Sequence, residues 1–171
     1  MPIEQATPVT MKGDPVTLTG NAVKVGDAAP DCTLVANDLS EVTLSSLRGK
    51  TCIISVVPSL DTGICDLQTK RFNKEASALG QNVVVLTVSM DLPFAQKRWC
   101  GATGSDKVQI LSDHRDASFG QAYGVLIKGL RLLTRAIFIL DANGKIVYKQ
   151  IVPEITTEPN YDEVLAAVPK A

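Results

Sequence analysis

The chain has 171 residues, of which 45% are hydrophobic and 20% are charged, and its formal net charge is −1. A chain of this length and hydrophobicity can bury a core, which argues against a disordered protein. The near-neutral charge gives no electrostatic reason to expect nucleic acid or an anionic membrane as a partner.

The N-terminus lacks the features of a targeting signal. Met1–Gln5 has no basic region followed by an apolar one, and no apolar run in the chain is long enough to span a membrane. We therefore expect a cytoplasmic protein. We also expect one domain, residues 1–171, because no linker or internal repeat interrupts the chain.

The first predicted elements are short β-strands. Val9–Met11 and Val16–Thr19 flank the turn-forming residues Lys12–Pro15, a pattern typical of a β-hairpin. Two further short strands and a helical turn are predicted next, at Cys32–Val35, Glu41–Leu44 and Ser45–Arg48.

Near-continuous apolar runs predict strands that are covered on both faces of a sheet. These runs are Cys52–Val57, Val83–Val88 and Ala136–Leu140, with Val108–Leu111 as a shorter candidate. Helical patterns separate or follow them, at Gly63–Leu79, Pro93–Cys100, Ala117–Tyr123 and Tyr161–Val168, the last with Asn160 as its candidate N-cap. Asn143-Gly144 joins the last apolar run to Lys145–Tyr148, which predicts a second hairpin.

This order of elements predicts an α/β fold. Its core would be a thioredoxin-like mixed sheet flanked by helices, with an N-terminal β-hairpin extension. A flavodoxin-like sheet is the alternative, and the final hairpin argues against it.

Cysteine chemistry is the strongest functional signal. The cysteines are Cys32, Cys52, Cys65 and Cys100. They form no CxxC pair, and the single histidine, His114, is far from any close cysteine pair, so we predict no metal site. In a cytosolic protein, disulfides are usually catalytic or redox-sensing. Cys32 and Cys52 lie in apolar strand contexts and are predicted to be inert core thiols.

Cys65 lies where a predicted strand gives way to a predicted helix. With Thr62 as the N-cap, Cys65 is the third helical residue, and its backbone N–H has no partner within the helix. The positive end of the helix dipole favours a thiolate there. Packing is the opposing interpretation, because Cys65 shares an apolar helix stripe with Phe72 and Ala76. The combination of Pro58, Thr62 and Cys65 favours the reactive thiol.

These residues carry a family resemblance. Pro58-x-x-x-Thr62-x-x-Cys65 resembles the active-site motif of peroxiredoxins, and nearly the whole chain is similar to the bacterial thiol peroxidase subfamily, an atypical two-cysteine group. The matching segments are Val57–Ser59, Asp61–Gly63, Lys70–Asn73, Ser89–Cys100 and Ile155–Pro159.

The resemblance implies a role for each site residue. Cys65 would be the peroxidatic cysteine, whose thiolate attacks a peroxide and becomes a sulfenic acid, and Cys100 would be the resolving cysteine. Thr62 would orient the thiolate and the peroxide, and Pro58 would shield the site. Arg135 would be the active-site cation that stabilises the thiolate and the charge on the peroxide oxygens.

The implied function is reduction of hydrogen peroxide and alkyl hydroperoxides through an intramolecular Cys65–Cys100 disulfide. Thioredoxin would be the reductant, a homodimer the assembly, and no cofactor would be needed. A thiol–disulfide oxidoreductase is disfavoured because it normally carries a CxxC. A thioredoxin-like redox sensor or binding module without peroxidase turnover, and a structural domain with an ordinary thiol at Cys65, remain as alternatives.

The region around Cys100 carries further expectations. The helix that begins near Pro93 should end at Cys100, because Gly101 is a natural helix stop. Cysteines on separate helices rarely start within the Cα separation of about 7 Å that a disulfide needs, so both segments should rearrange on oxidation. Trp99, Phe94 and Tyr123 are predicted to pack in the core.

Overall fold

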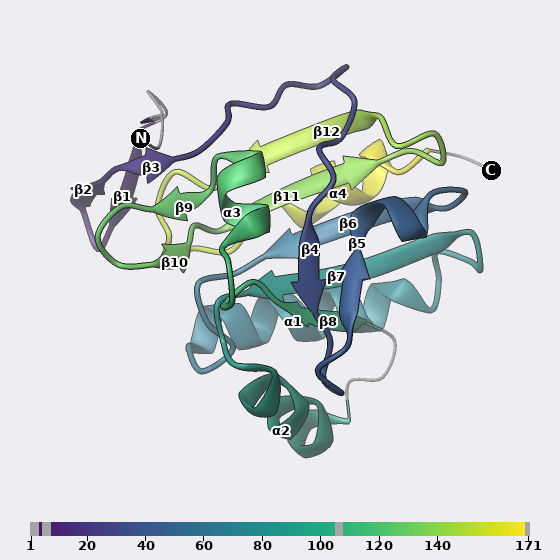
Figure 1. Ribbon diagram of the computed structural model, residues 1–171, viewed down its shortest axis with the longest axis horizontal. Helices are drawn as coiled ribbons and strands as arrows, with labels where there is room; N and C mark the ends of the chain where they lie inside the picture. The colour runs from purple at the N-terminus through teal and green to yellow at the C-terminus, as the bar shows by residue number, and fades with distance from the viewer. Residues whose placement is uncertain (1–3, 5–7, 105–107, 170–171) are drawn as a thin grey trace.

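A seven-stranded mixed sheet forms the centre of the computed structural model, which describes residues 4, 8–104 and 108–169 (Figure 1). The strand order is β12-β11-β6-β7-β8-β4-β5. The strands are β4 (Thr33–Val35), β5 (Glu41–Thr43), β6 (Thr51–Val56), β7 (Val83–Ser89), β8 (Gln109–Ser112), β11 (Ala136–Leu140) and β12 (Ile146–Ile151). Neighbours β6, β7 and β8 are parallel, whereas β11 is antiparallel to both β6 and β12. The predicted mixed sheet with its final hairpin is confirmed.

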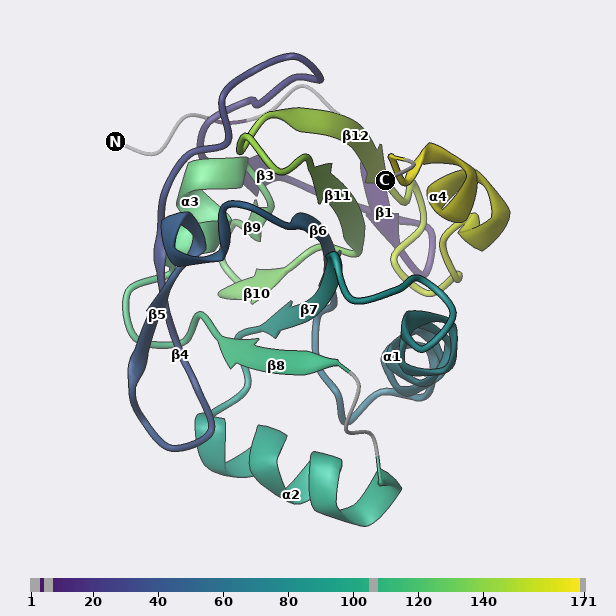
Figure 2. The same cartoon turned by 90° about the vertical axis from the view of Figure 1, so that its right-hand side faces the viewer.

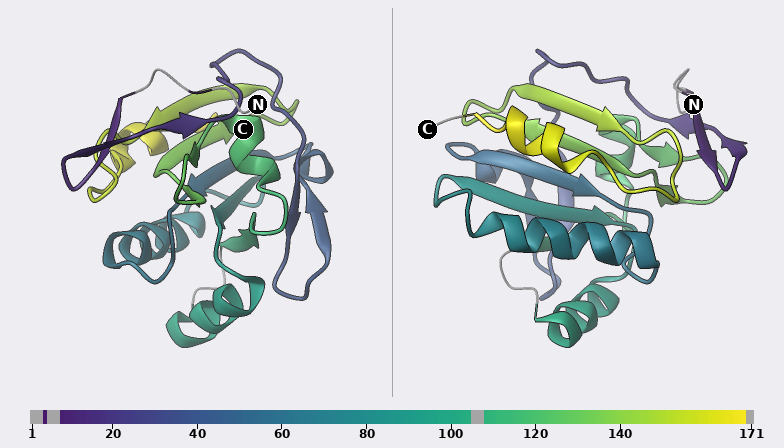
Figure 3. Two further views of the ribbon diagram at one scale, coloured as in Figure 1. Left: turned by 60° about the vertical axis from the view of Figure 1, so that its left-hand side comes forward. Right: turned by 180° about the vertical axis from the view of Figure 1, so that it is seen from behind.

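Helices cover both faces of this sheet. Helices α1 (Gly63–Ala76) and α4 (Tyr161–Ala167) lie on one face, and α3 (Ser118–Tyr123) and the 3₁₀ helix η1 (Leu44–Leu47) lie on the other (Figures 2 and 3). Helix α2 (Pro93–Thr103) lies beyond the β8 side of the sheet (Figure 2). Asn160 caps α4 as predicted, since its side chain accepts from the backbone N–H of Glu163.

Alternate strand residues supply an apolar cluster on each face, as the pleat of a sheet requires. On the α1 side the cluster includes Ile53, Val85, Ile137 and Ile139, together with Cys65 and Phe72 of the helix. On the opposite side it includes Ile54, Leu86 and Phe138, with Phe119 and Tyr123 of α3 and the thiols Cys32 and Cys52. Cys65 therefore lies on the other side of the sheet from Cys32 and Cys52.

The predicted N-terminal hairpin is confirmed, but its predicted second strand is divided between two sheets. Strands β1 (Val9–Met11) and β2 (Asp14–Val16) pair antiparallel, and the next residues, β3 (Leu18–Thr19), leave this hairpin for another sheet. There β3 pairs with β9 (Leu126–Ile127), which also pairs with β10 (Leu132–Leu133). Strands of two residues are too short to show a sequence period, so β9 and β10 were not predicted from the sequence.

Helix α2 is longer than the sequence predicted. It continues through Gly101 to Thr103, and Gly104, with φ of 68°, provides the left-handed cap. The N–H of Gly104 donates to the carbonyl of Cys100 at 3.0 Å. The expectation that the helix stops at Gly101 is therefore wrong, because the later glycine satisfies the last carbonyls. Helix α1 is shorter than the sequence predicted, since it ends at Ala76 rather than Leu79.

Phe94 does not pack in the core. Its side chain is 65% exposed, whereas Tyr123 is buried as predicted and Trp99 packs half-buried against the α1-side cluster. Helix α2 covers an edge of the fold rather than a face, so only one side of it is buried and Phe94 lies on the other side. The prediction for Phe94 is wrong for that reason.

The terminal segment Met1–Gln5, on which the expectation about targeting rests, lies outside the described residues except for Glu4. None of the helices in the described part of the chain is long and apolar enough to cross a membrane.

Candidate active site

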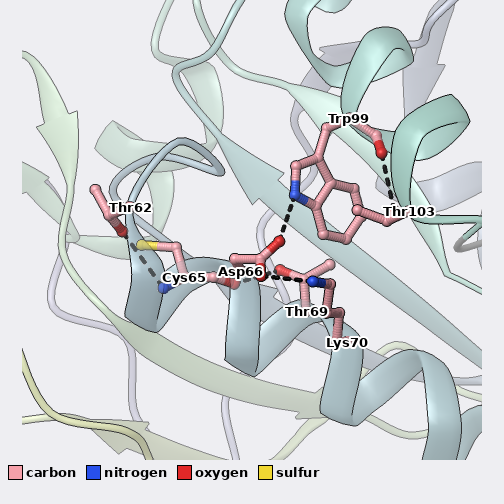
Figure 4. A network of polar contacts seen from close by, with 7 residues as sticks. All are labelled: Thr62, Cys65, Asp66, Thr69, Lys70, Trp99 and Thr103. Atoms are coloured by element: carbon pink, nitrogen blue, oxygen red, sulfur yellow. Dashed lines mark hydrogen bonds and ion pairs between the residues drawn. The ribbon is translucent and has the colours of Figure 1, made fainter.

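Cys65 lies in the first turn of α1, shortly after the carboxyl end of the central strand β6. Strand β6 ends at Val56, the chain turns at Pro58, and α1 begins at Gly63 with Thr62 as its N-cap. The Thr62 hydroxyl accepts a hydrogen bond from the backbone N–H of Cys65 at 3.4 Å (Figure 4). The predicted cap and the predicted position of Cys65 are confirmed. The side chain of Cys65 is fully buried.

Asp91 holds the turn that leads to Cys65. Its carboxylate accepts from the hydroxyl of Ser59 at 2.7 Å and from the backbone N–H of Leu60 at 2.8 Å. The hydroxyl of Ser89 also donates to it, at 2.7 Å. Asp91 follows β7, the parallel neighbour of β6, so the carboxyl ends of both strands meet at one edge. No role for Asp91 was predicted from the sequence, although an acidic residue directly after a parallel strand is the signal that could have revealed it.

Arg135 reaches the thiol from the neighbouring antiparallel strand, because Ala136 at the start of β11 pairs with Val56 at the end of β6. It precedes β11, and its Nη2 donates to Cys65 Sγ at 3.2 Å. Its Nη1 donates to Gln68 Oε1 at 2.9 Å and its Nε to the Ile155 carbonyl at 2.8 Å. The structure thus brings together Arg135 and Cys65, which are 70 positions apart in the sequence.

The charge of Arg135 is exceptional because the side chain is only 2% exposed. A buried charge is unfavourable unless it is paired or hydrogen-bonded. In the described part of the chain no carboxylate forms an ion pair with Arg135, and its partners are an amide, a carbonyl and the sulfur of Cys65. The arrangement therefore favours negative charge on that sulfur.

Gln68 fixes the guanidinium and was not predicted. It lies three residues after Cys65 on the same buried side of α1 and is fully buried. A guanidinium can only donate, so the Gln68 amide presents its oxygen to Arg135 and turns its NH₂ group to Ser55 Oγ, at 2.7 Å. A glutamine on the apolar stripe of a helix is the sequence signal that could have revealed this role.

An open pocket leads to this cluster. Its lining is largely apolar and comes from the Pro58 turn, the first turn of α1, the N-terminal hairpin and the loop after β12. The residues that matter for the site are Pro58, Thr62, Arg135, Leu132, Met11 and Ile155. Four of the five predicted site residues, Pro58, Thr62, Cys65 and Arg135, thus meet around one thiol.

Cys100 lies on a different helix from Cys65. It is half-buried in α2, burial raises the pKa of its thiol, and its Sγ lies 4.0 Å from Asn37 Nδ2. All four cysteines are free thiols. Cys65 and Cys100 border the same apolar cluster, so the structure places them in one region without joining them.

The other two cysteines are buried and poorly ionisable. Desolvation raises the pKa of Cys52 to about 12, and it raises the pKa of Cys32 still further above its ordinary value. Their burial agrees with the prediction that they are core thiols. Residues 4, 8–104 and 108–169 contain no group of three or more His, Cys, Asp or Glu side chains that could hold a metal ion, and His114 lies in the turn after β8.

Comparison with known proteins decides the family. The redoxin family model matches residues 24–165. This chain belongs to the redoxin family. Within the redoxins, the thiol peroxidase of Bacillus subtilis (strain 168) is 60% identical over 159 residues, which cover 93% of this chain and 95% of that protein. The thiol peroxidase of Oceanobacillus iheyensis is 59% identical over 162 residues, 95% of this chain and 98% of the relative.

Solved redoxin structures have the same fold. A peroxiredoxin-like protein from Aquifex aeolicus superimposes with a TM-score of 0.88 at 46% identity, and the match covers 96% of both chains. The thiol peroxidase from Chromobacterium violaceum shares the fold at a TM-score of 0.85 and 20% identity, over 95% of each chain. The predicted thioredoxin-like fold, the predicted family and the predicted enzyme class, thiol peroxidase, are confirmed.

Proposed function

We propose that this redoxin reduces hydroperoxides with Cys65 as the peroxidatic cysteine. The observation that carries the proposal is the 3.2 Å contact between buried Arg135 and Cys65 Sγ. The Cys65 thiolate attacks one peroxide oxygen, the O–O bond breaks, and the other oxygen leaves as water or an alcohol after taking up a proton. Cys65 becomes a sulfenic acid.

The neighbouring residues support this step. Arg135 donates to the sulfur and can stabilise charge on the departing oxygen, because its guanidinium is fixed by Gln68 and Ile155 before the peroxide arrives. The Thr62 hydroxyl lies at the same helix end and orients the thiolate and the peroxide. Pro58 covers the site and limits access of water.

Resolution would follow through Cys100. Its thiol attacks the sulfur of the Cys65 sulfenic acid, a Cys65–Cys100 disulfide forms, and water leaves. Because the two thiols lie on separate helices and Cys65 is fully buried, both segments rearrange in this step. Thioredoxin would then reduce the disulfide by dithiol exchange, and the cycle needs no metal or organic cofactor.

The remaining expectations belong to the same proposal. The chain would act as a single thioredoxin-like domain over residues 1–171, as a homodimer in the cytoplasm, on hydrogen peroxide and alkyl hydroperoxides. The apolar pocket beside Arg135 supports the alkyl substrates, because an organic tail can lie against Leu132, Met11 and Ile155.

A redox sensor or binding module on the same fold is the second candidate function. The half-buried position of Cys100 favours a sensor, because a disulfide at Cys100 would alter the surface of α2. Turnover separates the two functions, because a sensor is oxidised once, whereas a peroxidase consumes many equivalents of peroxide when a reductant is present.

The test is peptide mapping by mass spectrometry under non-reducing conditions after one equivalent of hydrogen peroxide. We expect one Cys65–Cys100 crosslink that disappears when thioredoxin is added, and repeated peroxide consumption in the presence of reduced thioredoxin. Slow oxidation spread over all four cysteines would contradict the proposal. The Cys65→Ser variant is the matched control and should form no crosslink.

A further inference from the structure

One hydrogen bond joins the two cysteine-bearing helices directly. The indole Nε1 of Trp99 donates to Asp66 Oδ1 at 2.8 Å (Figure 4). Asp66 follows Cys65 in the first turn of α1, and Trp99 precedes Cys100 in α2. Each partner of this bond is therefore the sequence neighbour of one cysteine.

Further contacts hold both ends of this bond. The second oxygen of Asp66 accepts from Lys70 Nζ at 2.8 Å, one turn along α1. The carbonyl of Trp99 accepts from the hydroxyl of Thr103 at 2.8 Å, and the indole ring packs half-buried against the α1-side apolar cluster. The hydrogen bond is charge-assisted and partly shielded from water, which makes it stronger than a neutral surface contact.

The direction of Trp99 determines the direction of Cys100. Consecutive helical residues point about 100° apart, so while Trp99 contacts Asp66 of α1 the side chain of Cys100 leaves α2 in a different direction, although both residues pack against the α1-side apolar cluster. Its Sγ lies 4.0 Å from Nδ2 of Asn37, in the turn between β4 and β5. Because Cys65 is fully buried in α1 and Cys100 lies on α2, we expect disulfide formation to require that α2 rotates or unwinds, and either movement would pull Trp99 away from Asp66.

We propose that the Asp66–Trp99 hydrogen bond restrains α2 in the reduced enzyme, must break before Cys100 can attack Cys65, and thereby sets the rate of disulfide formation. This inference rests on the proposed function and makes Asp66 and Trp99 positioning residues. Their bond prolongs the life of the sulfenic acid. During that time a second peroxide can oxidise the Cys65 sulfenic acid to a sulfinic acid, with release of one more water or alcohol.

Rapid-mixing kinetics of the Trp99→Phe and Asp66→Ala variants test the proposal. After one equivalent of hydrogen peroxide, we expect the Cys65–Cys100 disulfide to form about tenfold faster in each variant, the factor expected for loss of a charge-assisted hydrogen bond. The bimolecular oxidation of Cys65 should be unchanged in Trp99→Phe. The double variant should be no faster than either single variant, because both remove the same bond.

Two variants separate this bond from other effects of the substitutions. Asp66→Asn keeps an acceptor oxygen for Trp99 but removes its charge, so it should form the disulfide at a rate between those of wild type and Asp66→Ala. Lys70→Gln removes the ion pair on the other carboxylate oxygen without touching Trp99, and it should behave as wild type. Acceleration of equal size in Asp66→Asn and Asp66→Ala, or additive effects in the double variant, would contradict the proposal.

Amide hydrogen exchange gives a readout that needs no peroxide. In the reduced protein, Trp99→Phe should exchange the α2 amides about tenfold faster than wild type, while Lys70→Gln should not. Unchanged exchange together with an unchanged rate of disulfide formation would overturn the inference. If wild type forms no Cys65–Cys100 disulfide, the proposed function fails, and the exchange rates alone decide whether the bond restrains α2.

Discussion

Gln68 Oε1 lies 2.9 Å from Nη1 of Arg135, and both side chains are buried beside Cys65. Gln68→Leu should slow the oxidation of Cys65 by about tenfold, because Arg135 loses the partner that orients it. Leaving the buried N–H groups unpaired should also lower the free energy of unfolding by about 1–3 kcal/mol. Peroxide competition kinetics and denaturant unfolding measure the two effects.

Gln68→Glu is the informative control. It restores an acceptor for Arg135 but adds a carboxylate that competes with the Cys65 sulfur for the guanidinium charge. We expect Arg135 to remain held while the oxidation of Cys65 stays slow. Wild-type oxidation rates in Gln68→Leu would show that Arg135 needs no help from Gln68.

Glu154 should stabilise the folded protein at neutral pH and lose this contribution as the pH becomes acid. Its carboxylate accepts hydrogen bonds from the hydroxyl and backbone N–H of Thr156 and from the N–H of Gly13, which lowers its pKa to about 2. A lowered pKa contributes stability above the ordinary value of 4.5 that is lost as the pH falls towards 2. Glu154→Gln should therefore melt at a lower temperature than wild type at pH 7, and the difference should narrow between pH 4.5 and 2.

Thermal unfolding over that range provides the measurement. Glu154 also links the N-terminal hairpin to the loop whose Ile155 carbonyl receives Arg135, so the variant should lose some peroxidase rate at neutral pH. A difference in melting temperature between wild type and Glu154→Gln that stays constant from pH 7 down to pH 2 would contradict the role assigned to Glu154.

Asp113 should have the opposite effect on the pH dependence of stability, because its pKa is raised. It is buried near the start of α3, accepts from the N–H groups of Phe119 and Gly120, and burial raises its pKa to about 6. A raised pKa contributes stability that is present below the ordinary value of 3.8 and is lost as the pH rises to about 6. Asp113→Asn cannot ionise, so its free energy of unfolding should lack this fall between pH 4 and 6. Denaturant unfolding at a series of pH values measures the free energy of unfolding of both proteins. An equal fall in Asp113→Asn and wild type would refute this prediction.

Cys32→Ala and Cys52→Ala should each keep wild-type peroxidase turnover. Both thiols lie on the face of the sheet opposite Cys65, and burial raises the pKa of both. Each variant should lose only the packing of a small apolar side chain, about 1 kcal/mol of stability. Coupled turnover assays with thioredoxin check this, with Cys65→Ala as the inactive control. A loss of turnover without a loss of folding would assign either thiol a chemical role.

The parts of the fold that local sequence determines were predicted well. Thr62 and Asn160 cap their helices because their side chains reach an N–H within the same segment. Gly144, with φ of 78°, makes the last hairpin turn as its residue type indicated. The apolar run of β6 is buried on both faces, as continuous hydrophobicity predicts.

Features that depend on distant partners were missed. Gln68 and Asp91 are polar residues whose roles exist only once β11 and the Ser59 turn lie beside them. Strand β9 depends on pairing with β3, more than a hundred residues earlier in the chain, and β10 pairs with β9 in turn. Phe94 was misjudged because hydrophobicity does not reveal which side of α2 faces the protein.

The neutral partners of Arg135 have a consequence for the oxidised enzyme. In the proposed cycle, the buried guanidinium has no carboxylate partner, and the Cys65 thiolate serves as its counter-ion. When peroxide converts that thiolate to an uncharged sulfenic acid, the cation remains in a low-dielectric site with no compensating charge. We therefore expect the proposed oxidation to favour a conformation in which Arg135 meets water, and so to weaken the packing that keeps Cys65 away from Cys100.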